Sequence, residues 1–141
     1  MIKLWFGLII SAFLSIFSIT ASAESSVLSK ALNKNVSVTG NMTAEKFNNL
    51  MQQGFKSVIV NRPDQESENM ITASELRTLS EKSNISLIYQ PVISGQITDT
   101  DAKEFAKYYN SLPKPILLVC KSGNRSTVLF NKAKSLGLLN E

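Results

Sequence analysis

The sequence predicts an α/β fold: a mainly parallel sheet of four to five strands with helices on both of its faces. Short apolar or β-branched runs alternate along the chain with segments in which apolar residues recur every three or four positions. Regular alternation of strands and helices is typical of parallel sheets whose crossover helices cover both faces. The length of 141 residues allows one core of useful size, so we expect a single domain.

The first 23 residues are predicted to be a cleaved signal peptide outside this fold. Lys3 gives a positive start, residues 4–19 form an almost continuous apolar run, and Ala21-Ser22-Ala23 has the small-x-small pattern of a cleavage site. A membrane anchor is the alternative, because the run approaches the length that spans a bilayer. The small residues favour cleavage, which implies a periplasmic or secreted protein with no stable membrane anchor afterwards.

Four short segments have the pattern of β-strands. A loose lead-in or short helix is expected first, at residues 24–34, and the domain itself at residues 35–141. Alternation of apolar and polar residues predicts the first strand, and β-branched or apolar runs predict the other three. The predicted strands are residues 36–39, 57–60, 85–89 and 116–119.

Four helices are predicted between and after these strands. The first is capped by Thr43 and ends at Gly54, and the last spans residues 126–136. The second and third open on capping sequences at Thr72 and Thr98. Apolar residues at helical spacing give the first three helices their inner faces: Phe47, Leu50 and Met51; Leu76 and Leu79; Ala102, Phe105, Tyr109 and Leu112.

Three polar loops directly follow predicted strands. They are Arg62-Pro63-Asp64, residues 90–96 and residues 120–125. In open parallel sheets, ligands bind at the carboxyl ends of the strands. We therefore expect the three loops to meet at one edge of the sheet and to form the functional site.

The composition narrows the chemistry that such a site could perform. The chain has no histidine and one cysteine, which excludes histidine-based catalysis, His-ligated zinc, Cys-rich metal sites and an internal disulfide. We predict no metal and no cofactor. Without Lys3, 14 basic residues stand against 11 acidic ones, scattered along the chain, so no nucleic-acid partner is expected. The sequence does not indicate the oligomeric state.

The segment Cys120-Lys121-Ser122-Gly123-Asn124-Arg125-Ser126 has the properties of an anion-binding loop. Its glycine permits a turn that points several N–H groups inward, and the following helix adds its positive end. The arginine supplies a planar fork for an oxyanion, and the lysine raises the local potential. A thiol in this field is expected to be ionised and to act as a nucleophile. The alternative is that the cysteine only closes a buried strand.

Four further blocks precede the Cys120 loop in order along the mature chain. They are Val36-Ser37-Val38-Thr39-Gly40, Gly54-Phe55-Lys56-Ser57-Val58-Ile59, Asn61-Arg62-Pro63-Asp64 and Gln90-Pro91-Val92-Ile93-Ser94-Gly95-Gln96-Ile97-Thr98. Together with the loop, they resemble the beta-lactamase-hydrolase-like phosphatase-like domain family over nearly all of the mature chain. This resemblance implies a fold similar to dual-specificity phosphatases, with Cys120 as nucleophile and Arg125 as phosphate ligand. It also implies a small oxyanion or a phosphorylated compound as substrate.

The Cys120 loop taken alone resembles that of single-domain rhodaneses. Four residues separate Cys120 from Arg125, whereas protein tyrosine phosphatases have five. Val119 stands where those phosphatases usually carry His. Ser94-Gly95 stands where they often carry the Asp that acts as general acid. A sulfurtransferase with a persulfide on Cys120 is therefore one alternative function, and a non-catalytic oxyanion-binding module is another.

Two further residues are candidates for the site because they follow the second predicted strand. Asp64 is the candidate proton donor, and its alternative role is that of a turn residue after Pro63. Arg62 either joins the anion site or pairs with Asp64 or Glu66. Two other carboxylates, Asp99 and Asp101, are expected only to cap a helix.

Overall fold

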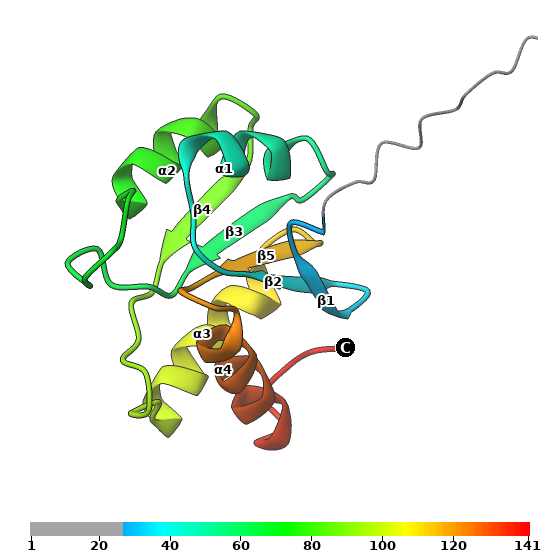
Figure 1. Ribbon diagram of the computed structural model, residues 1–141. Helices are drawn as coiled ribbons and strands as arrows, with labels where there is room; N and C mark the ends of the chain where they lie inside the picture. Colours follow the sequence, from blue (N-terminus) through cyan, green and yellow to red (C-terminus); the bar gives the residue numbers. More distant parts are fainter. Residues whose placement is uncertain (1–26) are drawn as a thin grey trace, which may run out of the picture.

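The computed structural model describes residues 27–141 (Figure 1), so the predicted signal peptide lies outside the described part. Within it, five strands form one sheet in the order β1-β2-β5-β3-β4. The elements in chain order are β1 (Lys30–Asn33), β2 (Val36–Thr39), α1 (Ala44–Met51), β3 (Ser57–Val60), α2 (Ala73–Glu81), β4 (Ser86–Tyr89), α3 (Asp99–Ser111), β5 (Ile116–Val119) and α4 (Asn124–Ser135). The predicted α/β class is confirmed.

The sheet is parallel apart from its first strand. β5 lies in the middle, with Ile116 in register with Val36 of β2 on one side and with Ser57 of β3 on the other. β1 pairs with β2 in the antiparallel direction. The predicted mainly parallel sheet is therefore confirmed, and its carboxyl edge brings the ends of β2, β5, β3 and β4 together.

The expectation of a loose segment or short helix at residues 30–33 was wrong, because these residues form β1. The side chain of Asn33 accepts hydrogen bonds from the backbone N–H groups of Asn35 and Val36, at 2.8 and 2.9 Å. These bonds close a tight turn that folds β1 back onto β2. The four residues of β1 are exposed or half-buried, so the strand has no apolar pattern from which it could be predicted.

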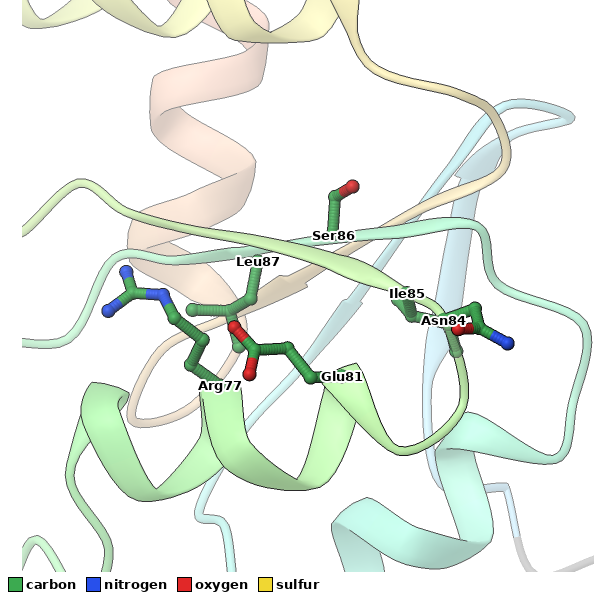
Figure 2. Close-up of a pocket in the computed structure, with 6 residues that line it drawn as sticks. All are labelled: Arg77, Glu81, Asn84, Ile85, Ser86 and Leu87. Atoms are coloured by element: carbon green, nitrogen blue, oxygen red, sulfur yellow. The ribbon is translucent and has the colours of Figure 1, made fainter.

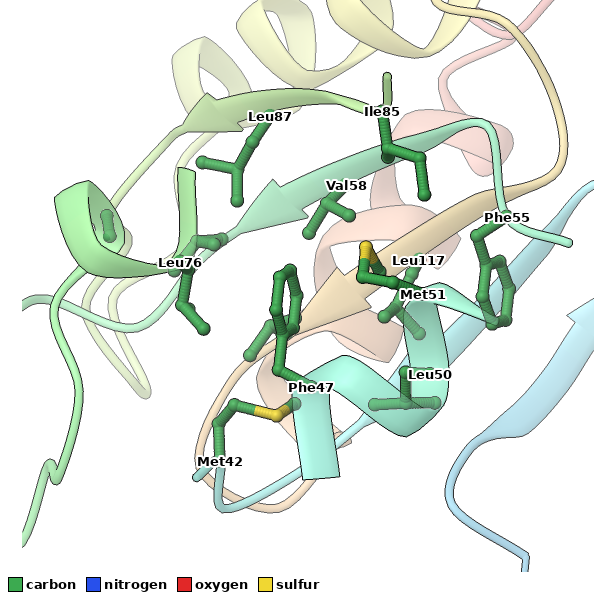
Figure 3. Close-up of a cluster of buried hydrophobic side chains, with 13 residues drawn as sticks. Met42, Phe47, Leu50, Met51, Phe55, Val58, Leu76, Ile85, Leu87 and Leu117 are labelled. Atoms are coloured by element: carbon green, nitrogen blue, oxygen red, sulfur yellow. The ribbon is translucent and has the colours of Figure 1, made fainter. Parts of the chain in front are cut away.

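Two apolar clusters lie on opposite faces of the sheet. α1 and α2 cover one face and α3 and α4 the other (Figure 1). Figure 3 shows the first cluster, in which Phe47, Leu50 and Met51 of α1 pack toward Val58 and Leu117 on the strands. Each fully buried side chain of this size contributes about 1.5–3 kcal/mol to folding. The predicted helices on both faces, and their inner faces, are confirmed.

The capping residues fix where the helices begin. Thr43 caps α1, and full capping boxes open α2 at Thr72 and α3 at Thr98, as predicted. α4 begins at Asn124, two residues earlier than predicted, because Gly123 is its N-cap. The loop after β5 is therefore short, and Arg125 lies in the first turn of the helix. None of the helices formed by residues 27–141 is both long and apolar enough to cross a membrane.

Candidate active site

The three loops predicted to meet at the carboxyl edge do meet there. Arg125 on α4 donates from Nη1 to the backbone oxygen of Val92, at 3.1 Å, in the loop after β4. The same guanidinium pairs with Glu66 in the loop after β3, with both nitrogen–oxygen distances at 2.9 Å. One side chain thus joins the start of α4 to the loops after β3 and β4.

The Cys120 loop is held in place by the end of β2. The N–H of Cys120 donates to the oxygen of Thr39 at 3.1 Å, and the N–H of Asn41 donates to the oxygen of Lys121 at 2.8 Å. Between them lies Gly40, where an added Cβ would come within 2.8 Å of the Lys121 backbone oxygen. The loop can approach β2 this closely only because residue 40 has no side chain.

The sulfur of Cys120 has a polar partner inside its own loop. Gly123 adopts a positive φ of 87°, as the predicted turn requires, and its N–H donates to Sγ at 3.0 Å. Cys120 is only 1% exposed, as expected for a residue that closes a buried strand. The contact to Gly123 nevertheless means that the sulfur serves as a hydrogen-bond acceptor at a helix N-terminus.

Several N–H groups around the loop are available to a ligand. In the part of the chain that the structure describes, the backbone N–H groups of Lys121, Ser122, Arg125 and Ser126 donate to no protein acceptor. Asn124 donates only weakly, to the Ser122 side chain at 3.3 Å. This set has the composition of the predicted anion-binding cradle, with the positive end of α4 behind it.

Arg125 is buried, at 8% exposure, and only part of its guanidinium is occupied. Both N–H groups of Nη1 and one of Nη2 are used by Glu66 and Val92. Nε has no partner among the described residues. Nε–H and the second N–H of Nη2 therefore form a free pair of donors, the fork that binds two oxygens of an oxyanion.

Glu66 is the carboxylate that fixes this arginine, and it also faces Arg62. Arg62 Nε lies 3.3 Å from Glu66 Oε1, and its other nitrogens donate to Asn41 Oδ1 and to the oxygen of Ser67. Of the alternatives for Arg62, the structure places it beside Glu66 rather than Asp64. Because all three nitrogens face protein atoms, its anion-binding role stays a prediction.

The two guanidinium groups determine the charge state of Glu66. The hydrogen bonds from Arg125 lower the pKa of this carboxyl below its ordinary value, against the opposing effect of its partial burial. The positive charges of Arg125, Arg62 and Lys121 add to the lowering. Glu66 is therefore ionised at neutral pH and is unsuited to donate a proton.

The other candidate carboxylates occupy structural positions. Asp64 Oδ1 accepts the N–H of Ala73 at 2.8 Å, at the N-terminus of α2. Its catalytic role therefore stays a prediction without a contact to the Cys120 loop. Asp101 closes the capping box of α3, as predicted, and Asp99 lies in the first turn of that helix. Glu68 pairs at 3.5 Å with the exposed Lys121.

A buried polar network connects the start of α4 to the ends of β3 and β4. Ser126 donates from Oγ to Asn61 Oδ1 at 2.8 Å, and Asn61 donates from Nδ2 to the oxygen of Gln90 at 3.1 Å. Both Ser126 and Asn61 are fully buried. Neither Asn61 nor Gly40 has a role that the sequence predicts, and Glu66 is predicted only as a possible partner of Arg62. The one available signal was an asparagine directly after a buried strand.

Two cavities flank the start of α4, with Asn124 in the wall of both. One, of about 360 Å³, reaches Arg125 and lies against residues 94–97. The other, of about 350 Å³, lies toward β2 and includes Lys30 and Lys46. A separate cavity of about 470 Å³ is lined by the end of α2 and the first half of β4 (Figure 2). That cavity contains no residue of the Cys120 loop.

Comparison with known proteins identifies the family. The family model described as beta-lactamase hydrolase-like protein, phosphatase-like domain, matches residues 29–137. The chain belongs to this family. The resemblance predicted from the sequence is thereby confirmed, and the chain is a phosphatase-like domain.

The curated relatives are longer proteins. A beta-lactamase hydrolase-like protein from Xylella fastidiosa (strain Temecula1) is 26% identical over 99 residues, which are 70% of this chain and 23% of the relative. One from Agrobacterium fabrum (strain C58) is 26% identical over 105 residues, 74% of this chain and 24% of the relative. The matched region spans about a quarter of each relative.

Solved structures share the fold. A candidate phosphatase from Neisseria meningitidis Z2491 aligns with a TM-score of 0.67 and 24% identity, covering 72% of both chains. The core catalytic domain of the PP-IP phosphatase Siw14 from S. cerevisiae aligns with a TM-score of 0.60 and 17% identity, covering 79% of this chain and 67% of that one. The predicted phosphatase-like fold is confirmed. The rhodanese-like character of the loop stays a prediction.

Proposed function

We propose that the protein is a cysteine-dependent phosphatase-like hydrolase of small phosphate esters. In this proposal the oxyanion lies in the Cys120 loop, between the free N–H groups and Arg125. The observation that carries the proposal is the buried Nε of Arg125, which has no partner among the described residues while Glu66 and Val92 hold the opposite side of the guanidinium. A buried unpaired donor is costly unless a ligand completes it.

The chemistry follows from the positions of these groups. The Cys120 thiolate attacks phosphorus, so that an S–P bond forms while the ester P–O bond breaks. The loop N–H groups and Arg125 stabilise the charge on the remaining oxygens in the transition state. The leaving oxygen takes a proton from water. A water molecule then attacks phosphorus and breaks the S–P bond, which releases phosphate and restores the thiolate.

Sulfur transfer is the second candidate, and one observation favours it. Among residues 27–141, Glu66 contacts Arg125 and is held ionised between two arginines, Glu68 pairs with the exposed Lys121, and Asp64 accepts the N–H of Ala73 at the start of α2. Phosphate esters with poor leaving groups need a proton donor. Transfer from thiosulfate does not: the thiolate takes the outer sulfur, sulfite leaves, and cyanide then removes the sulfur as thiocyanate and restores the thiolate.

One experiment tests both candidates. The purified protein and Cys120→Ser are assayed side by side with p-nitrophenyl phosphate and with thiosulfate plus cyanide. We expect p-nitrophenol release that falls at least ~10³-fold in Cys120→Ser. Thiocyanate formation, together with a mass gain of one sulfur atom on Cys120, would instead establish the sulfurtransferase. Turnover of neither substrate would leave the oxyanion-binding module, in which Arg125→Ala abolishes phosphate binding and Cys120→Ser does not.

We also propose that the first 23 residues direct export to the periplasm or beyond. The positive start, apolar run and Ala21-Ser22-Ala23 support this proposal. Mass spectrometry of the protein purified from its host is expected to give a chain that begins at Glu24. A full-length chain in the membrane fraction would establish the anchor instead.

A further inference from the structure

The cavity that reaches Arg125 is lined by one charged residue and otherwise by uncharged ones. It lies between the loop after β4 and the start of α4, and holds about 360 Å³. The residues that line it are Ser94, Gly95, Ile97, Asn124, Arg125 and Val128. Arg125 is the one charged residue among them, and the rest offer small, amide or branched aliphatic groups.

The aliphatic residues at this cavity are more exposed than folding requires. Val128 lies one turn after Asn124 on α4, and half of its surface is exposed (50%). Ile97 is half-buried, with its inner side packed against the second core cluster. Ile93, next to the Val92 that contacts Arg125, is also exposed, but it is not among the residues that line the cavity. Apolar surface gathered at a binding cavity marks a ligand contact more often than scattered apolar residues do.

The lysine that follows Val128 on the same face of α4 is paired. Lys132, one turn further along α4 than Val128, forms an ion pair at 3.1 Å with Asp99 of α3. The cavity on the other side of Asn124 differs, because Lys30 and Lys46 line it. An apolar group beside the oxyanion would therefore be placed on the Val128 side, and a second charged group on the lysine side.

We propose that the cavity between Ile97 and Val128 is the subsite for an apolar substituent of the substrate. The substrate class is then an organic oxyanion, with an aryl or branched alkyl group attached close to the anionic centre, rather than an inorganic anion. This inference rests on the proposed function, because it needs the oxyanion to bind Arg125. It holds for an organic phosphate ester and for an organic sulfur donor alike, since both place a carbon group beside the oxyanion.

Binding of phosphonates tests the subsite without any turnover, because a C–P bond is not hydrolysed by this chemistry. Isothermal titration calorimetry compares phenylphosphonate with methylphosphonate on the unmodified protein. We expect phenylphosphonate to bind about tenfold more tightly, because its ring is partly buried against Val128 and Ile97. Val128→Ser is expected to reduce this preference to about threefold or less, and Val128→Leu to retain it.

Leu136→Ser is the matched control, since Leu136 is a similarly exposed aliphatic residue two turns further along, at the C-cap of α4. It is expected to leave the tenfold preference unchanged. Equal binding of the two phosphonates, or a preference that persists in Val128→Ser, would overturn the subsite while leaving the proposed function intact. Binding of neither phosphonate would overturn oxyanion binding by Arg125, and the subsite with it.

Discussion

The loop after β5 and the loop after β3 both supply the site, but they are built in different ways. In the first, the contact that defines the geometry runs from Gly123 to Cys120, three residues apart. In the second, Glu66 reaches Arg125 across 59 residues of sequence. The first loop carries Cys120, the nucleophile of the proposed function, and the second occupies one side of the Arg125 guanidinium and leaves the other side open. A site of this kind depends on one local and one distant arrangement.

The two loops also differ in their electrostatics. The Cys120 loop has N–H groups without a protein acceptor among residues 27–141 and lies at a helix N-terminus, an arrangement that favours negative charge. The loop after β3 offers Glu66 and Glu68, which neutralise part of that attraction. Glu66 lies against two buried guanidinium groups, whereas Glu68 meets an exposed lysine. Substitutions in the Cys120 loop are therefore expected to change oxyanion binding, and substitutions in the loop after β3 to change how firmly Arg125 is held.

The largest effect is expected from Arg125→Lys, which breaks both arrangements at once. Lysine keeps the positive charge but has no planar fork, so it cannot hold Glu66 and an oxyanion together. We expect kcat/KM for p-nitrophenyl phosphate to fall by about 10²–10³-fold. A fall of less than about fivefold would mean that the loop N–H groups alone bind the oxyanion.

Glu66→Gln breaks the distant arrangement only. The amide leaves two buried guanidinium groups without their carboxylate, although glutamine can still accept one hydrogen bond. We expect the free energy of unfolding to fall by about 2 kcal/mol, less than for a fully buried pair because the Glu66 side chain is 25% exposed. Urea unfolding of the variant and the unmodified protein measures this difference.

Glu68→Gln is the matched control from the same loop. Glu68 pairs with Lys121 at 3.5 Å, and its side chain is 78% exposed. Exposed ion pairs contribute little, so we expect the free energy of unfolding to change by less than about 0.5 kcal/mol. We call the contacts of Glu66 with Arg125 and Arg62 the clamp. Equal losses of stability in Glu66→Gln and Glu68→Gln would mean that the clamp stabilises the protein no more than an exposed ion pair does.

The clamp also has a defined pH dependence. The pKa of Glu66 is lowered in the folded protein from its ordinary value of 4.5, so the folded state stabilises the ionised carboxyl. Its contribution to stability is fully present above the ordinary value and is lost as the pH falls below it, toward the lowered pKa. The stability difference between the unmodified protein and Glu66→Gln is therefore expected to be constant at pH 6–7 and to shrink below about pH 4.5. A difference that is unchanged at pH 3 would mean that the charge is not responsible.

The two loops were not equally predictable from the sequence. The Cys120 loop could be recognised because its glycine, arginine and cysteine are neighbours in sequence and act through local backbone geometry. The strands and helices were predictable for the same reason, since apolar spacing and capping residues are local. The clamp depends on which of several carboxylates comes within 2.9 Å of Arg125, and only the folded chain decides that. The strand β1 was missed because it is formed by the turn at Asn33 and by pairing with β2. Its own residues have no strand pattern.

A smaller effect is expected from Ser126→Ala, which removes a buried hydrogen bond beneath the Cys120 loop. The Asn61 oxygen loses its donor while it stays buried, so we expect the free energy of unfolding to fall by about 1–2 kcal/mol. Ser122→Ala, at an exposed position of the same loop, is expected to change it by less than about 0.5 kcal/mol. A similar result for both variants would mean that the buried network does not support the loop.

The smallest effect is expected at Asp64, where two substitutions separate a proton donor from a helix cap. Asp64→Asn removes the acid but keeps the Oδ1 acceptor for the N–H of Ala73, whereas Asp64→Ala removes both. If the cap is the role of Asp64, Asp64→Asn retains kcat/KM for p-nitrophenyl phosphate within about threefold, and Asp64→Ala lowers the free energy of unfolding by about 1 kcal/mol. If Asp64 is the proton donor, Asp64→Asn lowers kcat/KM by about 10²-fold although it keeps the cap, and Asp64→Ala lowers it as much. The second result would establish the catalytic role predicted from the sequence, and would require the loop after β3 to move toward Cys120 during the reaction.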